Sequence, residues 1–436
     1  MEQASWPRGR KIERKRKGKI MNYFDLDLNL SKEDMALKKE TNKFASEVMR
    51  PVSLELDQMS AEEVIAPESP MWGFFKKAYE LDYHKITYPE DVGGAGLTPS
   101  QIQIVMEELA WGSFGLTLGL NTSLDAAAAM VGNEEHIKEF TIPYCECKDG
   151  SYVGCWAITE PDHGSDTLVT GYPGFRDPKV PSQCGAHLDG NEYVITGQKS
   201  SWVSGGTIAK TILLMCQIDP AKGHAGSGMF IFSLDRPGIS KGKPLDKIGA
   251  RDLNQGEIFF DEVRVPKEAL LVGPEDYEAA LEAHLSLTLS MVGVWATGLA
   301  RAGFEEALTY TRERVQGGKP LVEHKNVQEK LFAMFRKVEA SRHLSRAAFV
   351  YNWSHPMAPK KRAIEYSMAA KTFATQTALE VTSDAIQLFG SIGISNGYLV
   401  EKFFRDARTT LICDGSNDTL SLVGGDKVAR TYPRMN

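Results

Sequence analysis

Apolar residues recur at helical spacing soon after the start of the chain. From Ser31 onward they fall on one face of a predicted helix, and Ser31 and Asp34 are spaced as a capping pair in its first turn. We expect Pro51 to bend or end this helix, because proline has no amide hydrogen to continue the hydrogen-bond ladder. The same spacing predicts further helices around residues 71–83 and 101–111.

The pattern changes after about Gly154, where short runs of β-branched and aromatic residues alternate with Gly, Pro and Asp. The predicted strands cover 193–196, 211–217, 229–233 and 257–265. Helical periodicity returns from about Glu275 and continues almost to Asp426. An order of helices, strands and helices predicts an α+β protein of segregated domains and disfavours a doubly wound sheet. The expected units are a basic leader at 1–20, a helical domain at 21–154, a β domain at 155–272 and a second helical domain at 273–436.

The expected leader contains eight lysine and arginine residues and almost no apolar side chains. Such a tract stays solvated and disordered. It has neither the apolar core of a signal peptide nor the spaced arginines of a transit peptide, so targeting is the weaker interpretation. Glu, Lys, Arg and Gly all have purine-rich codons, which leaves another interpretation open: a translated ribosome-binding region, with Met21 as the true start.

Composition restricts the classes of function. The 436 residues carry a net charge of −7 and the pI is near 5.8, which gives no overall attraction to nucleic acid or to anionic membranes. No apolar run reaches the ~18 residues that are needed to span a bilayer. The six cysteines have neither a secretory signal nor zinc-type spacing. We therefore expect free thiols in the reducing cytoplasm and no bound metal.

A polar segment lies where the helical pattern gives way to strands. Residues 158–166 read I-T-E-P-D-H-G-S-D, which taken alone is typical of a polar turn. Residues 197–206 read G-Q-K-S-S-W-V-S-G-G, and a tryptophan in a strand usually belongs to the core. Three more segments are P-E-D-V-G-G-A-G at 89–96, D-A-I-Q-L-F-G-S-I-G at 384–393 and E-K-F-F-R-D-A at 401–407.

Taken in order, these five segments resemble the signatures of FAD-dependent acyl-CoA dehydrogenases, and the resemblance covers nearly the whole chain after the leader. It implies that Ile158 and Thr159 meet the flavin, with the Thr159 hydroxyl bonded to the edge of the isoalloxazine ring. Ser165 would contact the FAD pyrophosphate or the CoA arm, because backbone beside a glycine allows close approach. The resemblance also implies that Trp202 packs against the flavin and that Ser204 bonds near its N5. In this chain one residue is inserted before the tryptophan, and serine replaces the usual threonine.

The resemblance implies that the adenine half of FAD binds at a subunit interface. Arg314 and the segment from Gln387 to Gly390 would hold it, which requires an oligomer, commonly a homotetramer. Taken alone, Arg314 is typical of a solvated charge at a helix end. Gly317 stands where relatives carry phenylalanine, so we expect a looser FAD contact there.

The chemistry of this family needs a base on one side of the acyl Cα–Cβ bond, commonly a glutamate in a Y-E-G-T turn. Here residues 413–416 read C-D-G-S, so Asp414 takes the place of the glutamate and Gly415 lies beside the substrate. Aspartate withdraws the carboxylate by roughly 1.5 Å, which suits a substrate that is bulky at Cα. The alternative is that Asp414 only caps the turn. Asp91 is a second candidate carboxylate, although an acidic residue there more often shapes the Gly-rich turn.

Departures from the family pattern bear on the substrate. Thr117 stands where glutaryl-type relatives carry an arginine, so a dicarboxylyl substrate is not expected. Asn121 lies at the predicted floor of the acyl pocket and makes a long apolar tunnel unfavourable to desolvate. Ser286 and Leu289 replace the acidic-x-x-Arg pair that often meets CoA, which leaves the CoA contacts open.

These features predict a compact acyl-CoA, with cyclohexanecarbonyl-CoA or cyclohex-1-ene-1-carbonyl-CoA as the specific hypothesis. A short branched-chain acyl-CoA dehydrogenase and an enoyl-CoA reductase are alternatives. A flavoprotein that binds nucleic acid and has lost dehydrogenation is the alternative from another class, and the acidic chain argues against it. The resemblance implies electron-transferring flavoprotein as the partner, with another electron acceptor left open.

Overall fold

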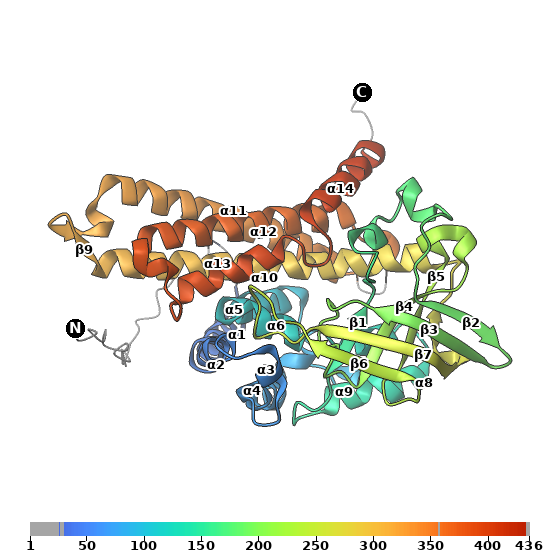
Figure 1. Ribbon diagram of the computed structural model, residues 1–436. Coiled ribbons are helices and arrows are strands. Elements are labelled where there is room, and N and C mark those ends of the chain that lie inside the picture. Colours follow the sequence, from blue (N-terminus) through green and yellow to red (C-terminus); the bar gives the residue numbers. More distant parts are fainter. Residues whose placement is uncertain (1–25, 27–29, 356–357, 433–436) are drawn as a thin grey trace, which may run out of the picture.

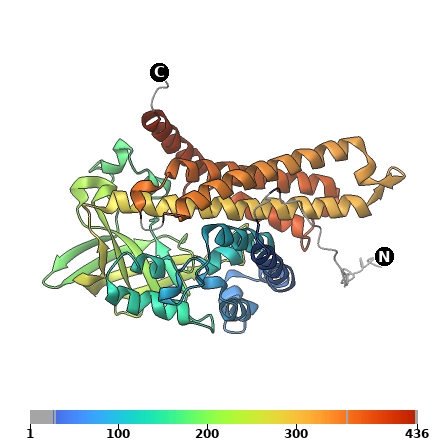
Figure 2. The same ribbon diagram turned by 180° about the vertical axis from the view of Figure 1, so that it is seen from behind.

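The chain forms a first set of helices, a β-sheet unit and a long helical bundle, in that order (Figure 1). The structure is a computed structural model that describes residues 26, 30–355 and 358–432. The predictions for 1–20 and for Met21 therefore lie outside the described residues. The predicted α+β fold is confirmed. Seen from behind, the long helices run along one side of both other units (Figure 2).

The first part of the chain is helical. Its helices are α1 Lys32–Phe44, α2 Arg50–Asp57, α3 Ala61–Ile65, α4 Pro70–Glu80, α5 Pro99–Gly112, α6 Phe114–Leu120, α7 Leu124–Ala129, α8 Glu134–His136 and α9 Ile142–Glu146. The capping pair is confirmed, because the Asp34 amide donates to the Ser31 hydroxyl at 3.0 Å and the Ser31 amide donates to the Asp34 carboxylate at 3.0 Å. Pro51 does not end the helix. It lies in the first turn of α2, directly after a π-helical turn at Ala45–Met49, where proline is well tolerated.

The middle of the chain forms a mostly antiparallel sheet. Its strands are β1 Gly154–Ala157, β2 Gly185–Asp189, β3 Glu192–Lys199, β4 Thr211–Gln217, β5 Ser227–Ser233, β6 Ile239–Pro244, β7 Gly256–Pro266 and β8 Leu270–Val272. Their order is β6-β7-β3-β2-β4-β5-β8, and β1 pairs with β4 in parallel. Every residue of β4 is buried. Ile212 and Leu214 pack in the core of the β unit, whereas Leu213 and Met215 pack against α10, as the alternation of side chains along a strand requires.

The last part of the chain is a bundle of long helices. They are α10 Tyr277–Glu313, α11 Lys325–Trp353, α12 Ile364–Phe389, α13 Leu399–Thr410 and α14 Asn417–Thr431. By length and composition α10 could cross a membrane, contrary to the expectation from apolar runs, but 83% of its most apolar stretch is buried inside the protein. It is therefore the central helix of the bundle. A small hairpin of β9 Val315–Gln316 and β10 Lys319–Pro320 follows it, with positive φ at Gly317 and Gly318.

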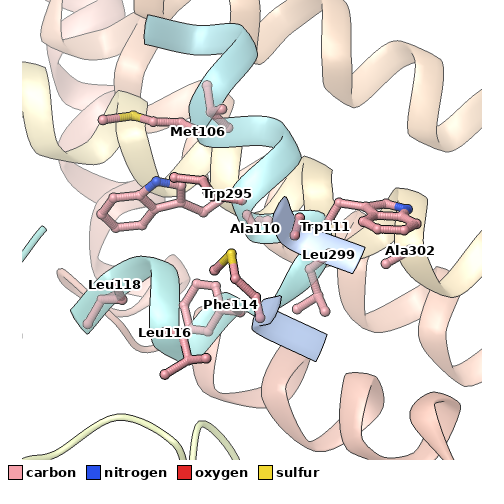
Figure 3. Packing of buried hydrophobic residues seen from close by; sticks show 14 of the residues in the cluster. Met106, Ala110, Trp111, Phe114, Leu116, Leu118, Trp295, Leu299 and Ala302 are labelled. Atoms are coloured by element: carbon pink, nitrogen blue, oxygen red, sulfur yellow. The ribbon is translucent and has the colours of Figure 1, made fainter. Parts of the chain in front are cut away.

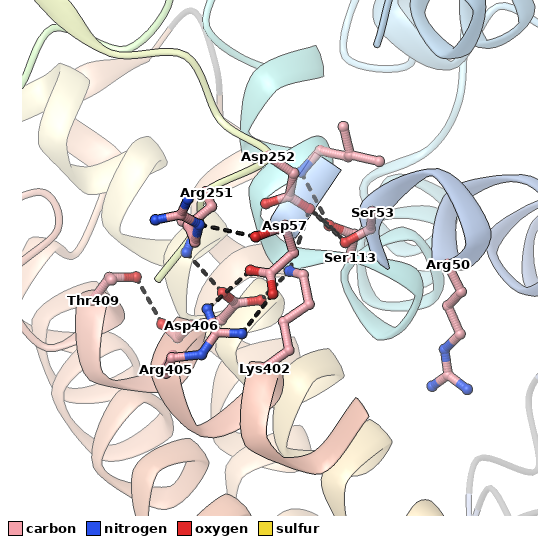
Figure 4. A network of polar contacts seen from close by, with 12 residues as sticks. Arg50, Ser53, Asp57, Ser113, Arg251, Asp252, Lys402, Arg405, Asp406 and Thr409 are labelled. Carbon is pink, nitrogen blue, oxygen red and sulfur yellow. Dashed lines mark hydrogen bonds and ion pairs between the residues drawn. The ribbon is translucent and has the colours of Figure 1, made fainter. Parts of the chain in front are cut away.

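Apolar and ionic contacts hold the three parts together. Met106 of α5, Phe114 of α6 and Trp295 of α10 belong to one large apolar core (Figure 3). A buried polar network joins the loop before β7 to the first helices and to α13 (Figure 4). In that network the Lys402 ammonium lies 2.6 Å from Asp406 and 3.4 Å from Asp252. Because each unit packs on its neighbours, residues from all three are fixed around the sites described next.

Candidate active site

The segment 158–166 leaves the end of β1 and is anchored by a buried ion pair. The Lys199 ammonium lies 2.7 Å from the Glu160 carboxylate, and both side chains are almost fully buried. Lys199 also donates to the Ile158 carbonyl at 3.1 Å. The amides of Gln183 and Cys184 donate to the same carboxylate. A buried charge pair is stable only when its remaining hydrogen bonds are made, and here these bonds fix the start of the segment.

Thr159 lies beside the segment 197–206. The Ser200 amide donates to the Thr159 carbonyl at 3.0 Å, and the hydroxyls of the two residues are 3.0 Å apart. Gln255 donates to both the Trp202 carbonyl and the Ser204 hydroxyl at 3.1 Å. Trp202 is 55% exposed, so it is not the core residue that its strand context suggests. The exposed indole of Trp202 and the hydroxyls of Thr159 and Ser204 are groups that fit a planar polar ring such as a flavin.

The turn that contains Asp414 contacts the segment 158–166. The Ser416 amide donates to the Ser165 hydroxyl at 2.9 Å, across 251 positions in the sequence. Asp414 and Gly415 have φ of 50° and 100°. Left-handed backbone is unfavourable for aspartate and easy for glycine. The turn is therefore held in a conformation that needs external support.

Lys371 of α12 supplies that support and was missed by the sequence analysis. Its side chain is fully buried, and its ammonium donates to the Gly415 carbonyl at 2.7 Å, the Asn417 side chain at 2.9 Å and the Leu411 carbonyl at 3.3 Å. Burial lowers the pKa of Lys371 to about 8. Burial also raises the pKa of Asp414, and the Lys371 ammonium opposes part of that rise. A single lysine among the uncharged buried residues of this helix face was the available signal.

The predicted adenine-binding residues lie in another region. Arg314 caps the end of α10, and the ring of Tyr310 stacks at 3.9 Å on that of Phe389, which brings this end of α10 close to Gly390. Arg314, Gln387 and Gly390 are exposed. The β9 hairpin beside Arg314 lies at the end of the bundle far from the sheet (Figure 1). Within one chain, these residues therefore do not meet Thr159 and Trp202.

Asn121 lines a small cavity of about 60 Å³ between α10 and the first helices. Its side-chain amide donates to the Thr117 carbonyl at 2.8 Å. Thr117 itself is buried and donates to the Ser113 carbonyl. Asp91 is exposed in a short 3₁₀ turn at Glu90–Val92 and does not line this cavity. The roles assigned to these residues stay predictions.

The two residues at the positions expected for CoA contacts, Ser286 and Leu289, make their contacts inside the protein. The Ser286 hydroxyl donates to the Ala283 carbonyl within the helix, and Leu289 is fully buried in an apolar cluster. Neither side chain reproduces the acidic-x-x-Arg pair, so the CoA contacts stay open.

A candidate metal cluster exists among the described residues. His163, Asp166 and His224 bring ligand atoms within 4.8 Å of one another. The Asp166 carboxylate lies 2.7 Å from His163 Nδ1 and 3.3 Å from His224 Nε2. Burial by itself raises the pKa of Asp166, but hydrogen bonds from the two histidines hold it below the usual range. These hydrogen bonds account for the cluster, and the expected absence of a metal stays a prediction.

Three family models match the chain in order. They describe the N-terminal, middle and C-terminal domains of acyl-CoA dehydrogenase and match residues 31–147, 155–263 and 278–428.

Individual relatives agree with these matches. The chain is 29% identical over 414 residues to a short-chain-specific acyl-CoA dehydrogenase of Clostridium acetobutylicum, which covers 93% of this chain and 100% of the relative. It is 31% identical over 338 residues to a cyclohex-1-ene-1-carbonyl-CoA dehydrogenase of Syntrophus aciditrophicus, which covers 77% of each chain. Among solved structures, butyryl-CoA dehydrogenase from Megasphaera elsdenii matches with a TM-score of 0.80 and 26% identity, covering 93% of this chain and 100% of that chain.

Proposed function

The chain belongs to the acyl-CoA dehydrogenase family, and we propose that it removes a proton and a hydride from a compact acyl-CoA. The specific hypothesis is an alicyclic acyl group, as in cyclohexanecarbonyl-CoA or cyclohex-1-ene-1-carbonyl-CoA. Members of this family are oxidoreductases that act on CH–CH bonds and depend on FAD. The similarity to a cyclohex-1-ene-1-carbonyl-CoA dehydrogenase supports the alicyclic hypothesis weakly, because a short-chain relative is nearly as similar.

The exposed ring of Trp202 and the hydroxyls of Thr159 and Ser204 are the groups that would hold the flavin ring. Bound FAD supplies the acceptor for the two electrons of the hydride. Ser165 would orient the FAD pyrophosphate or the CoA arm, and its contact with the Ser416 amide couples that position to the base.

The position of Asp414 is the main observation that supports the proposal. Its carboxylate would take the Cα proton of the thioester while the opposite face of the substrate meets the flavin. Burial raises the pKa of this carboxyl, which makes the carboxylate a stronger base than a solvated aspartate. Because Asp414 is one methylene shorter than glutamate, it suits a substrate whose Cα is bulky or is pushed toward the base.

Two subunits would complete each FAD site. The β9 hairpin, which directly follows Arg314, lies far from the sheet within one chain (Figure 1), so a second copy would be needed to bring the two sets of residues together. A homotetramer, electron-transferring flavoprotein or another acceptor as partner, and a cytoplasmic location are parts of this proposal. Free cysteines among the described residues support a reducing compartment.

Anaerobic flavin bleaching against a panel of acyl-CoA thioesters tests the proposal, because it reports hydride transfer without an electron acceptor. We expect cyclohexanecarbonyl-CoA or cyclohex-1-ene-1-carbonyl-CoA to bleach the flavin at lower concentration than butyryl-CoA or isobutyryl-CoA. A preference for isobutyryl-CoA would favour the branched-chain alternative. Oxidation of the reduced enzyme by enoyl-CoA, faster than its reduction by acyl-CoA, would favour the reductase alternative. Protein that cannot be reconstituted with FAD would refute the proposal.

A further inference from the structure

The cavity beside Asn121 has an unusual lining for an acyl pocket. One wall is a face of α10, where His284, Thr288 and Met291 recur at helical spacing. The facing wall includes His84, which precedes the Gly-rich turn. The neighbouring face of α10 belongs to the apolar cluster with Leu420, which adjoins Gly415. One helix therefore supports both the cavity and the turn of the base.

Several polar atoms at this cavity have no hydrogen-bond partner within the described part of the chain. They are both ring nitrogens of His84, His284 Nε2, the Thr288 hydroxyl and Trp353 Nε1. His84 is 2% exposed and Thr288 is 4% exposed. Buried polar groups are nearly always hydrogen-bonded in folded proteins, and leaving them unpaired is unfavourable. A purely hydrocarbon acyl group in contact with them would leave every one unpaired.

The residues that line the cavity determine which charge a ligand can carry there. No lysine or arginine lines the cavity among the described residues, so nothing there would neutralise a carboxylate. Burial lowers the pKa of His84 and of His284 to about 4, so both rings are neutral at pH 7. A neutral imidazole offers one donor and one acceptor, and a threonine hydroxyl offers both. The matching ligand is a neutral group that also donates and accepts.

We propose that the acyl group of the substrate carries a hydroxyl remote from the thioester, which hydrogen-bonds with His84 and Thr288 in this cavity. The inference rests on the proposed function, because it takes the cavity as the far end of the acyl pocket. Asn121 also lines the cavity, and its side-chain amide donates to the Thr117 carbonyl. The pocket thereby distinguishes a hydroxylated compact acyl group from its hydrocarbon counterpart.

Matched pairs of thioesters test the proposal on the FAD-loaded enzyme. The pairs are cyclohexanecarbonyl-CoA with 4-hydroxycyclohexanecarbonyl-CoA, and butyryl-CoA with 4-hydroxybutyryl-CoA. In at least one pair we expect the hydroxylated member to half-bleach the flavin at a concentration at least about tenfold lower, since a site built for a hydroxyl discriminates against the analogue without it. Equal or weaker bleaching by both hydroxylated members would overturn this inference and leave the proposed function standing. Failure of all four thioesters would overturn the proposed function and this inference with it. Stronger bleaching by glutaryl-CoA than by either hydroxylated member would overturn it in favour of a charged group.

Substitutions test which residues cause the preference for the hydroxylated thioester. Thr288→Val keeps the shape of the side chain, and His84→Phe keeps a ring to stack on Tyr79, which lies 3.9 Å from it. We expect each to reduce the preference for the hydroxylated member to less than about threefold. Thr382→Val is the matched control, because Thr382 is buried in α12 and donates only within its helix. An unchanged preference in Thr288→Val and in a folded His84→Phe enzyme would remove the cavity from substrate recognition.

Discussion

Replacing Lys371 by methionine tests whether the lysine acts on the base or only on the fold. Methionine retains much of the buried volume but removes the ammonium that donates to the Gly415 carbonyl and to Asn417. Two effects follow. The turn loses its hydrogen bonds, and Asp414 loses a positive charge that favours its carboxylate form.

The expected change in stability is the difference between two opposing terms. Because burial lowers the pKa of Lys371 to about 8, keeping the ammonium charged at pH 7 costs about 3 kcal/mol relative to a lysine in water. Methionine removes that cost. It also leaves the Gly415 carbonyl without a donor, at about 1–3 kcal/mol, and removes one of two hydrogen bonds from both the Leu411 carbonyl and the Asn417 side chain, at about 0.5–1.5 kcal/mol each. With the middle of those ranges, the free energy of unfolding falls by about 1 kcal/mol, which a protein of ordinary stability survives.

We expect Lys371→Met to change how the flavin-bleaching rate depends on pH. Asp414 accepts a proton only when ionised, so activity is lost as pH falls through its pKa. Without the nearby ammonium that pKa rises further, and the acid limb of the flavin-bleaching rate should move to higher pH. Lys247→Met is the matched control, since burial also lowers the pKa of Lys247 to about 8 but the side chain lies before β7 and donates to the Leu253 carbonyl. It should leave the pH profile of flavin bleaching unmoved. A destabilised Lys371→Met enzyme with an unmoved acid limb would show that Lys371 has only a structural role.

Four further substitutions test the remaining assignments. Asp414→Asn should lower the bleaching rate by ~10²-fold to 10⁴-fold at nearly unchanged substrate binding, because an amide cannot accept the proton; wild-type rates would place the base elsewhere. Asp414→Glu should lower kcat/KM for ring substrates and spare linear ones, and the opposite order would refute the argument from side-chain length. Arg314→Ala should lower the FAD content of purified protein more than the rate of flavin-saturated enzyme, and an equal FAD content would remove Arg314 from the site. Asp91→Asn should leave turnover unchanged, since Asp91 is exposed, and a large loss would make it a second base.

The sequence predicted the elements well because their signals are local. The predicted strand at 211–217 has the bounds of β4, and the capping pair at Ser31 forms as expected. Pro51 was harder to predict, because the π-helical turn that accommodates it has no simple sequence signature. For the site, the motifs indicated which segments matter but not how they meet. The contact between Ser165 and Ser416 spans 251 positions and depends on the packing of the β unit against the bundle.

Under the proposed role of Asp414 as the base, the two anchors of its turn explain why one missing methylene matters. Ser165 holds the turn from the β unit through the Ser416 amide, and Lys371 holds it from α12 through the Gly415 carbonyl. Because the turn is fixed on both sides, and Asp414 already has a φ of 50°, its backbone has little freedom to move toward a substrate. The shorter side chain cannot be offset by a shift of the turn. The Cα of the substrate must therefore approach the carboxylate, which a compact group with bulk at Cα does and a slender linear chain does not.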